Sequence, residues 1–156
     1  MKLKTIEESI FQGKPFQSMI QKASVNIIYT AHWLQQKHNQ VFKTFDLSSQ
    51  QFNVLRILRG QHPKSVTVKL ISERMIDQSS NVSRLIEKLL AKDLIIRQTS
   101  PQDRRRVDVQ INQKGLDLLS EIDQKLEGFE GDFKEVSDEE LETLSNILDK
   151  IRGISD

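Results

Sequence analysis

The side chains best suited to recognising a ligand lie in two polar runs. The first run consists of short or fork-shaped hydrogen-bonding residues and a lysine one turn further on: Gln78, Ser79, Ser80, Asn81, Ser83, Arg84 and Lys88. In a DNA major groove an Asn can pair with adenine and an Arg with guanine, while serines reach bases or phosphates. A lysine suits a backbone phosphate. The same serines could instead do no more than cap a helix, so this run by itself leaves both interpretations open.

The second run places Asp103 before three consecutive cations, Arg104, Arg105 and Arg106. Adjacent cations repel one another, and the pairing of strands needs none of them. A narrow minor groove, with its concentrated negative potential, would stabilise an inserted Arg, and Asp103 could hold a neighbouring guanidinium by a charge-assisted bond. The run therefore favours a DNA contact over a solvated turn.

A helix-turn-helix pattern contains the first run. Apolar spacing from Val66 onward predicts a short helix over 67–75, followed by a break. A second helix is expected to begin with Ser79 or Ser80 as its N-cap and to end at Asp93. Its early exposed positions are those of the first polar run.

Two β-rich segments, 94–99 and 107–111, flank the second run. Turn-forming residues from Pro101 to Asp103 separate them, which predicts a hairpin. Two helices followed by a basic hairpin indicate a winged helix-turn-helix over residues 47–111. Such a module places one helix in a major groove and its hairpin near a minor groove.

Long helices are expected on both sides of this module. Apolar residues recur every three or four positions within 16–45 and again within 112–152, where one helix is expected to reach residue 133. The first of these stripes is long for packing inside a domain of this size, so part of it is expected to meet another subunit. Residues 1–15 have little periodicity and are predicted to form a flexible arm with one helical turn at 6–11. The predicted fold class is mainly α with a small β-wing and helical dimerisation regions at both ends.

The distribution of charge is uneven along the 156 residues. The net charge is +1, but residues 1–62 carry +5, residues 63–112 carry +4 and residues 113–156 carry −8. A basic front and an acidic end suit a protein that offers one face to a polyanion. A dipolar protein with no nucleic-acid partner would show the same division.

Several classes of protein are disfavoured by composition. There is no cysteine, which excludes disulfides and thiol switches and fits a reducing cytoplasm. No apolar run is long enough for a bilayer, so no membrane partner is expected. The three histidines lack metal-ligand spacing, and no phosphate loop or nucleophile elbow is present. We therefore expect no catalytic residues, no metal, no cofactor and no enzyme activity.

The sequence around the second run resembles the MarR-type (multiple antibiotic resistance regulator) transcription factors. The wing motif of that family, S-P-x-D-x-R, is similar to residues 100–105, and its following strand and helix start resemble residues 107–115. Residues 81–85 and 92–95 also resemble the family's recognition helix and its exit. Two positions depart from the pattern: Asn112 stands where threonine is usual, and Asp93 replaces a glycine. Both replacements suit their positions, since Asn caps helices and Asp tolerates the left-handed conformation.

The resemblance implies an obligate homodimer whose terminal helices intertwine and whose two modules read a near-palindromic operator, most commonly as a bacterial repressor. It implies that Arg105 enters the minor groove and that Asp103 supports it. It further implies a small aromatic or anionic effector that releases the DNA, for which the candidate residues are Tyr29, His32, Trp33 and Arg56. The alternative function is a winged-helix module that binds a protein and no specific DNA.

Overall fold

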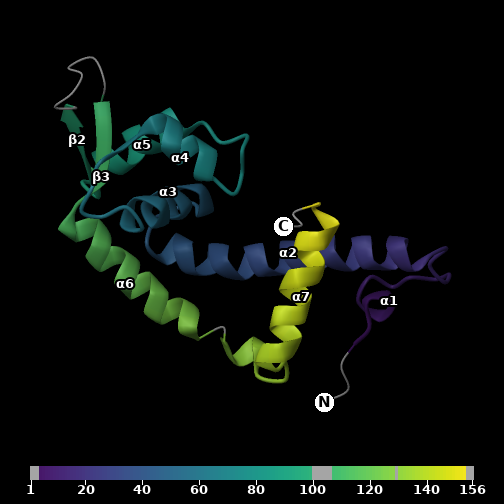
Figure 1. Cartoon of the computed structure of the whole chain (residues 1–156). Helices are drawn as coiled ribbons and strands as arrows, with labels where there is room; N and C mark the ends of the chain where they lie inside the picture. The colour runs from purple at the N-terminus through teal and green to yellow at the C-terminus, as the bar shows by residue number, and fades with distance from the viewer. Residues whose placement is uncertain (1–3, 100–106, 129, 154–156) are drawn as a thin grey trace. The chain divides into compact units, whose positions relative to one another are not determined.

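The computed structural model describes residues 4–99, 107–128 and 130–153, so the wing-tip candidates Asp103, Arg104, Arg105 and Arg106 lie outside the described residues (Figure 1). Within this part of the chain the fold is mainly helical with one small antiparallel sheet. This confirms the predicted fold class. Residues 1–49 and 50–156 form two compact units.

The first unit contains a short helix, α1 (Ile6–Ser9), and a long one, α2 (Met19–Thr44). Thr5 begins α1 with a reciprocal cap, since its side chain accepts the Glu8 N–H at 3.3 Å and the Glu8 carboxylate accepts the Thr5 N–H at 2.8 Å. Ser18 caps α2 by accepting the Gln21 N–H at 3.1 Å. A cap at this position explains why the helix begins at Met19 rather than at residue 16.

In the second unit α3 (Ser49–Arg59) precedes a helix pair, α4 (Val68–Arg74) and α5 (Val82–Ala91). The wing strands are β2 (Ile95–Thr99) and β3 (Val107–Ile111). The core lies between these elements and is made of fully buried aliphatic side chains: Val54, Leu55, Leu58, Ile71, Ile86, Leu89, Ile95, Val109, Ile111, Leu119 and Ile122.

The sheet contains a third strand that the sequence did not predict. Residues Val66–Thr67 form β1, which pairs with β3 so that the strand order is β1-β3-β2. The sequence predicted a helix over 67–75 and no strand before it; the helix begins at Val68 with Thr67 as its N-cap. Two residues are too few to show the alternation of a strand, and β1 exists because β3 offers its second edge to Val66, opposite Val109.

The C-terminal part consists of α6 (Gln113–Glu127), a 3-10 turn η1 (Glu130–Phe133) and α7 (Asp138–Ile151). The expected continuous helix to residue 133 was wrong, because α6 ends at Glu127 and Gly128 follows it as the C-cap. Glycine is a poor helix former, so the chain leaves the helix there. The salt bridge from Arg59 to Asp123, at 2.5 Å, ties α6 to α3.

Gly115, in the first turn of α6, allows that helix to approach the wing. A Cβ at this position would lie 2.3 Å from the Leu94 carbonyl oxygen and 2.7 Å from the Ile111 Cγ1. Gly115→Ala is therefore expected to lower the free energy of unfolding by about 1–3 kcal/mol, as overpacking does, in a urea titration. Gly60→Ala is the matched control, because its nearest neighbours would lie 3.6 Å away, in ordinary contact. Equal stability of the two variants would contradict this close approach.

Candidate nucleic-acid interface

The helix α5 presents one polar face and one apolar face. Val82, Ile86 and Leu89 are buried in the core. Ser83, Arg84 and Lys88 are exposed on the opposite side, together with Gln78, Ser79 and Asn81 just before the helix, whereas Ser80 is half-buried. The structure thus brings most of the first polar run together at the start of one helix.

The N-cap of α5 differs from the expected one. Asn81, rather than Ser79 or Ser80, caps the helix, because its Oδ1 accepts the Arg84 N–H at 3.1 Å. The cap occupies the acceptor of the Asn81 amide and leaves its NH₂ group as a donor. Ser79 is instead engaged in the preceding turn.

Asp77 organises that turn, where the sequence predicted a break between the two helices but gave Asp77 no role. Its Oδ1 accepts the Ser79 N–H at 3.0 Å and the Ser79 hydroxyl at 2.6 Å. The Ile76 N–H donates to Asn53 Oδ1 at 2.9 Å, and the Gln78 amide donates to the Met75 carbonyl at 2.9 Å. The spacing Asp-x-Ser is typical of such turns and could have identified Asp77.

The hydrogen bonds from Ser79, first from its hydroxyl and then from its N–H, lower the pKa of Asp77. A pKa lowered by folding means that this contribution to stability is present above the unfolded pKa and is lost as pH falls through the folded pKa. Ser79→Ala is expected to raise the pKa of Asp77 toward its ordinary value, so the loss begins at a higher pH. An NMR titration of the Asp77 carboxyl measures this, with Ser83→Ala as the control that leaves the value unchanged. An unaltered titration in Ser79→Ala would assign the shift to another group.

An ion pair joins α5 to the wing. The Arg97 guanidinium on β2 contacts the Glu87 carboxylate on α5, and both side chains are about half exposed. The sequence did not point to either residue. Glu87 and Arg97 lie on different elements, and a local sequence pattern does not show which residues of two elements meet. The contact holds Arg97 beside the polar face of α5.

A hollow of about 280 Å³ lies between α4, α5 and the sheet. It is lined by Val68, Ser83, Ile86, Arg97 and Val109. Its walls are therefore mostly aliphatic, with one hydroxyl and one guanidinium. This combination can hold a small apolar body that carries a negative charge.

The described part of the wing consists of the two strands β2 and β3. They pair in register from Ile95 opposite Ile111 to Thr99 opposite Val107. Asp93 adopts a φ of 55° at the exit of α5, as expected for the residue in the usual glycine position. Asp108 on β3 is buried, as is its neighbour Val109.

The candidate effector residues fall into both units. Tyr29, His32 and Trp33 lie on α2, where His32 pairs with Gln36 at 2.9 Å and the Lys37 ammonium lies 4.7 Å from the Trp33 ring. Arg56 lies on α3, in the second unit, with its guanidinium 6.0 Å from the Phe52 ring. His32, Trp33 and Arg56 thus each have a neighbour within their own unit.

Metal sites and membrane-spanning helices are both absent from the described ranges. No group of three or more His, Asp or Glu side chains that could hold a metal ion occurs there. None of the helices in that part of the chain has the length and apolar content needed to span a bilayer. Burial lowers the pKa of His38, whose ring lies 6.0 Å from Phe42.

Comparisons with known proteins identify the family. Residues 47–107 match the MarR family model. The HTH-type transcriptional regulator MhqR of Bacillus subtilis (strain 168) is 31% identical over 109 residues, which cover 67% of this chain and 72% of MhqR. A MarR transcription factor from Planctomyces limnophilus is 29% identical, with a TM-score of 0.66 over 86% of this chain and 98% of that chain.

A third similar protein is BpsR of Bordetella bronchiseptica, described with the regulation of its DNA binding by 6-hydroxynicotinic acid. It is 26% identical, with a TM-score of 0.62 over 81% of this chain and 98% of that chain. The exposed polar face of α5 and the paired wing strands fit a winged helix-turn-helix that binds DNA, and two of these relatives are transcription regulators. The chain belongs to the MarR family and is a DNA-binding transcription regulator rather than an enzyme.

Proposed function

We propose that two copies of this chain form a homodimer in the cytoplasm, bind the two halves of a near-palindromic operator and repress transcription there, and that a small effector releases them. The observation that carries the proposal is the exposed polar face at the start of α5, held beside the wing by the contact between Glu87 and Arg97. A bound dimer that covers promoter DNA blocks access to it, which supports repression.

The proposed DNA contacts divide into two grooves. In the major groove, Arg84 and the Asn81 NH₂ group meet base edges, with Gln78, Ser79, Ser80 and Ser83 around them, and Lys88 meets a phosphate. In the minor groove Arg105 is inserted, supported by Asp103 and flanked by Arg104 and Arg106. Because Asn81 caps the helix through its oxygen, its NH₂ group can donate to an acceptor such as adenine N7.

Exposed apolar stripes support the homodimer. On α2, Ile20 is 80% exposed and lies two turns before Ile27 on the same face. On α7, Leu144, Ile147 and Ile151 form a second stripe, and Ile151 is 62% exposed. Apolar stripes of this kind mark sites of protein association, and a two-fold pair covers both stripes twice.

Two sets of residues are proposed to contact the effector. Tyr29, His32, Trp33 and Arg56 offer aromatic rings and a cation, and the hollow beside Arg97 offers aliphatic walls and a guanidinium. The regulation of BpsR by 6-hydroxynicotinic acid is the support for an aromatic acid as the ligand class. A panel of aromatic carboxylates that includes this acid, titrated against DNA complexes of Trp33→Ala and Arg97→Gln, distinguishes the two places. Insensitivity of the wild-type complex to the whole panel would contradict an effector of this class.

The test of DNA recognition is an anisotropy titration with the DNA upstream of the protein's own gene and with selected random sequences. Each copy offers five cations, Arg84, Lys88, Arg104, Arg105 and Arg106, and so a dimer offers ten. If half to all of them neutralise phosphates, the slope of log K against log salt lies between about −5 and −9. Salt-insensitive or sequence-independent binding would overturn the proposal, and an in vitro transcription assay with the selected site distinguishes repression from activation.

A further inference from the structure

Phe11 stands outward from the end of α1 in a backbone conformation that suits glycine. Its φ is 54°, and its side chain is 93% exposed. The Ile10 N–H bonds to the Ile6 carbonyl and the Gln12 N–H bonds to the Glu7 carbonyl at 2.9 Å, which is the hydrogen-bonded end of a helix whose left-handed residue is usually Gly. A bulky residue is rarely found there. Neither burial nor backbone preference within α1 explains an aromatic ring at this position.

The turn that carries Phe11 is well anchored within its own unit. Ile6 is buried, and the Glu7 carboxylate forms an ion pair with the Lys22 ammonium on α2 at 2.7 Å. The reciprocal cap between Thr5 and Glu8 fixes the start of α1. The ring is thus presented by a held turn, and Lys14 adds an exposed cation three residues later.

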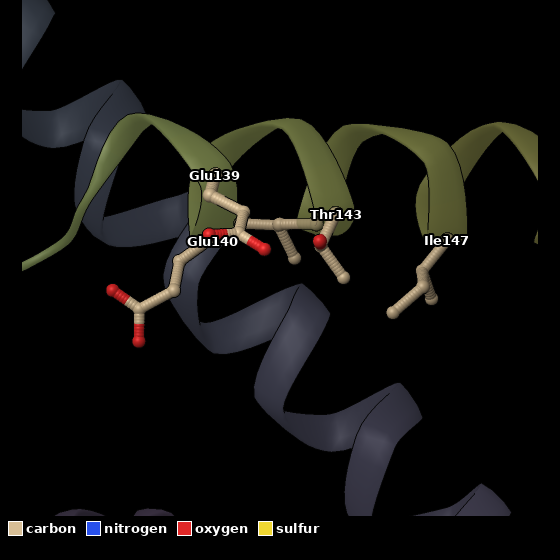
Figure 2. A pocket seen from close by; sticks show the side chains of 5 residues that line it. Glu139, Glu140, Thr143 and Ile147 are labelled. Atoms are coloured by element: carbon tan, nitrogen blue, oxygen red, sulfur yellow. The ribbon is translucent and has the colours of Figure 1, made fainter.

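The helix α7 carries a hollow with the complementary chemistry (Figure 2). Its volume is about 340 Å³, and it is lined by Glu139, Glu140, Thr143, Leu144 and Ile147. Leu144 and Ile147 are 50% and 51% exposed. The Glu140 carboxylate caps α7 by accepting the Ser137 N–H at 2.8 Å. The hollow therefore has an aliphatic floor and an acidic rim on which Glu139 is the carboxylate not used by the cap.

We propose that Phe11 of one copy inserts into the α7 hollow of a second copy, with Lys14 beside Glu139. The proposal rests on the homodimer of the proposed function and adds a clasp to it. The homodimer brings a second copy to this helix, and charge complementarity favours the contact, because residues 1–62 carry +5 and residues 113–156 carry −8. Each copy offers both the ring and the hollow, so a two-fold pair makes the contact twice.

Because the sequence contains no cysteine, cysteines introduced for cross-linking are the only thiols that react. One preparation carries Phe11→Cys and is labelled with ¹⁵N; the other carries Leu144→Cys, unlabelled. After mixing and treatment with a short bis-maleimide, mass spectrometry is expected to find linked pairs of one labelled and one unlabelled chain. Asn146→Cys in place of Leu144→Cys is the control, since it lies about 200° around α7, and it is expected to link poorly.

Two cross-linking results would overturn the clasp. One is equal linking at Asn146 and Leu144. The other is linking mainly within one chain when Phe11→Cys and Leu144→Cys are combined, which would make the chain its own occupant.

Phe11→Gly distinguishes an effect on dimerisation from an effect on the stability of the fold. Glycine suits the left-handed position, so the fold is expected to be retained or stabilised, while the dimer dissociation constant rises about tenfold or more on loss of an aromatic anchor. Sedimentation equilibrium measures the dissociation constant, and thermal unfolding measures the stability. A wild-type monomer would defeat the homodimer itself, whereas a wild-type dimer unchanged by Phe11→Gly would defeat the clasp alone.

Exchanging the charges of Lys14 and Glu139 tests whether the two side chains meet at the rim of the hollow. Lys14→Glu and Glu139→Lys are each expected to weaken the dimer by up to about fivefold per contact, in the range of exposed ion pairs. The double variant is expected to restore much of the loss, because it re-forms the pair with reversed sign. Additive losses in the double variant would show that the two residues do not meet.

Discussion

Ile20→Asp is expected to convert the homodimer to monomers at micromolar concentration and to weaken operator binding by about 100-fold or more. Ile20 is 80% exposed in one chain and occupies the second position of α2. An Asp there removes no core contact and suits the positive end of the helix dipole, so the fold is expected to survive. In a two-fold pair the change occurs twice, and each copy places a carboxylate in an apolar contact.

The loss of DNA binding follows from the loss of the dimer. Two modules held together bind two half-sites with an avidity that exceeds single-module binding by about 10²–10⁴. Sedimentation velocity and anisotropy titration measure the two losses. Asn26→Asp is the matched control, because it adds the same charge to α2 at an exposed position about 120° around the helix. If Ile20→Asp remains a dimer that binds the operator as the wild type does, the stripe on α2 is not the interface.

Arg105→Ala is expected to lower operator affinity by about 1–3 kcal/mol, or roughly 5- to 150-fold. A guanidinium in a narrow minor groove meets the most negative potential on the duplex, and nothing replaces it when the side chain ends at Cβ. The loss is expected to depend on the width of the minor groove at the contacted step. Operators in which that step is changed from A·T to G·C therefore reduce the difference between variant and wild type.

Arg152→Ala is the control for net charge, because it removes the same charge from the acidic end of the chain, where Arg152 pairs with Asp149. It is expected to leave affinity nearly unchanged. Asp103→Ala is expected to weaken binding less than Arg105→Ala, since the role proposed for Asp103 is to hold the guanidinium. Equal effects of Arg105→Ala and Arg152→Ala would mean that only overall charge matters.

The order of helices and strands in the winged helix-turn-helix could be predicted from local sequence signals. The helix of α5 follows from apolar residues at helical spacing, and β3 follows from Val107, Val109 and Ile111 at every second position. Asn112 was identified as the cap of α6, and it does accept the Gly115 N–H at 2.9 Å. These signals succeed because caps and periodicity act within a few residues of one another.

The start of α5 shows where local signals become ambiguous. Ser79, Ser80 and Asn81 are all competent caps, and the choice among them depends on the preceding turn. Asp77 takes both hydrogen bonds of Ser79, and Asn53, 23 residues before Ile76, holds the Ile76 N–H. Asn81 is then the residue that meets the Arg84 N–H. A partner so distant in sequence cannot be read from the local run.

The sequence by itself determined the winged helix-turn-helix and the family, because each depends on residue types at short, regular spacing. The tertiary structure decided what depends on distant partners. It paired Val66 with Val109 as a third strand, joined Glu87 to Arg97 across α5 and the wing, and tied Arg59 to Asp123. It also left the ring of Phe11 and the stripe of α7 uncovered. Such contacts form only when folding closes long loops of chain, and no periodicity along the sequence encodes which side chains then meet.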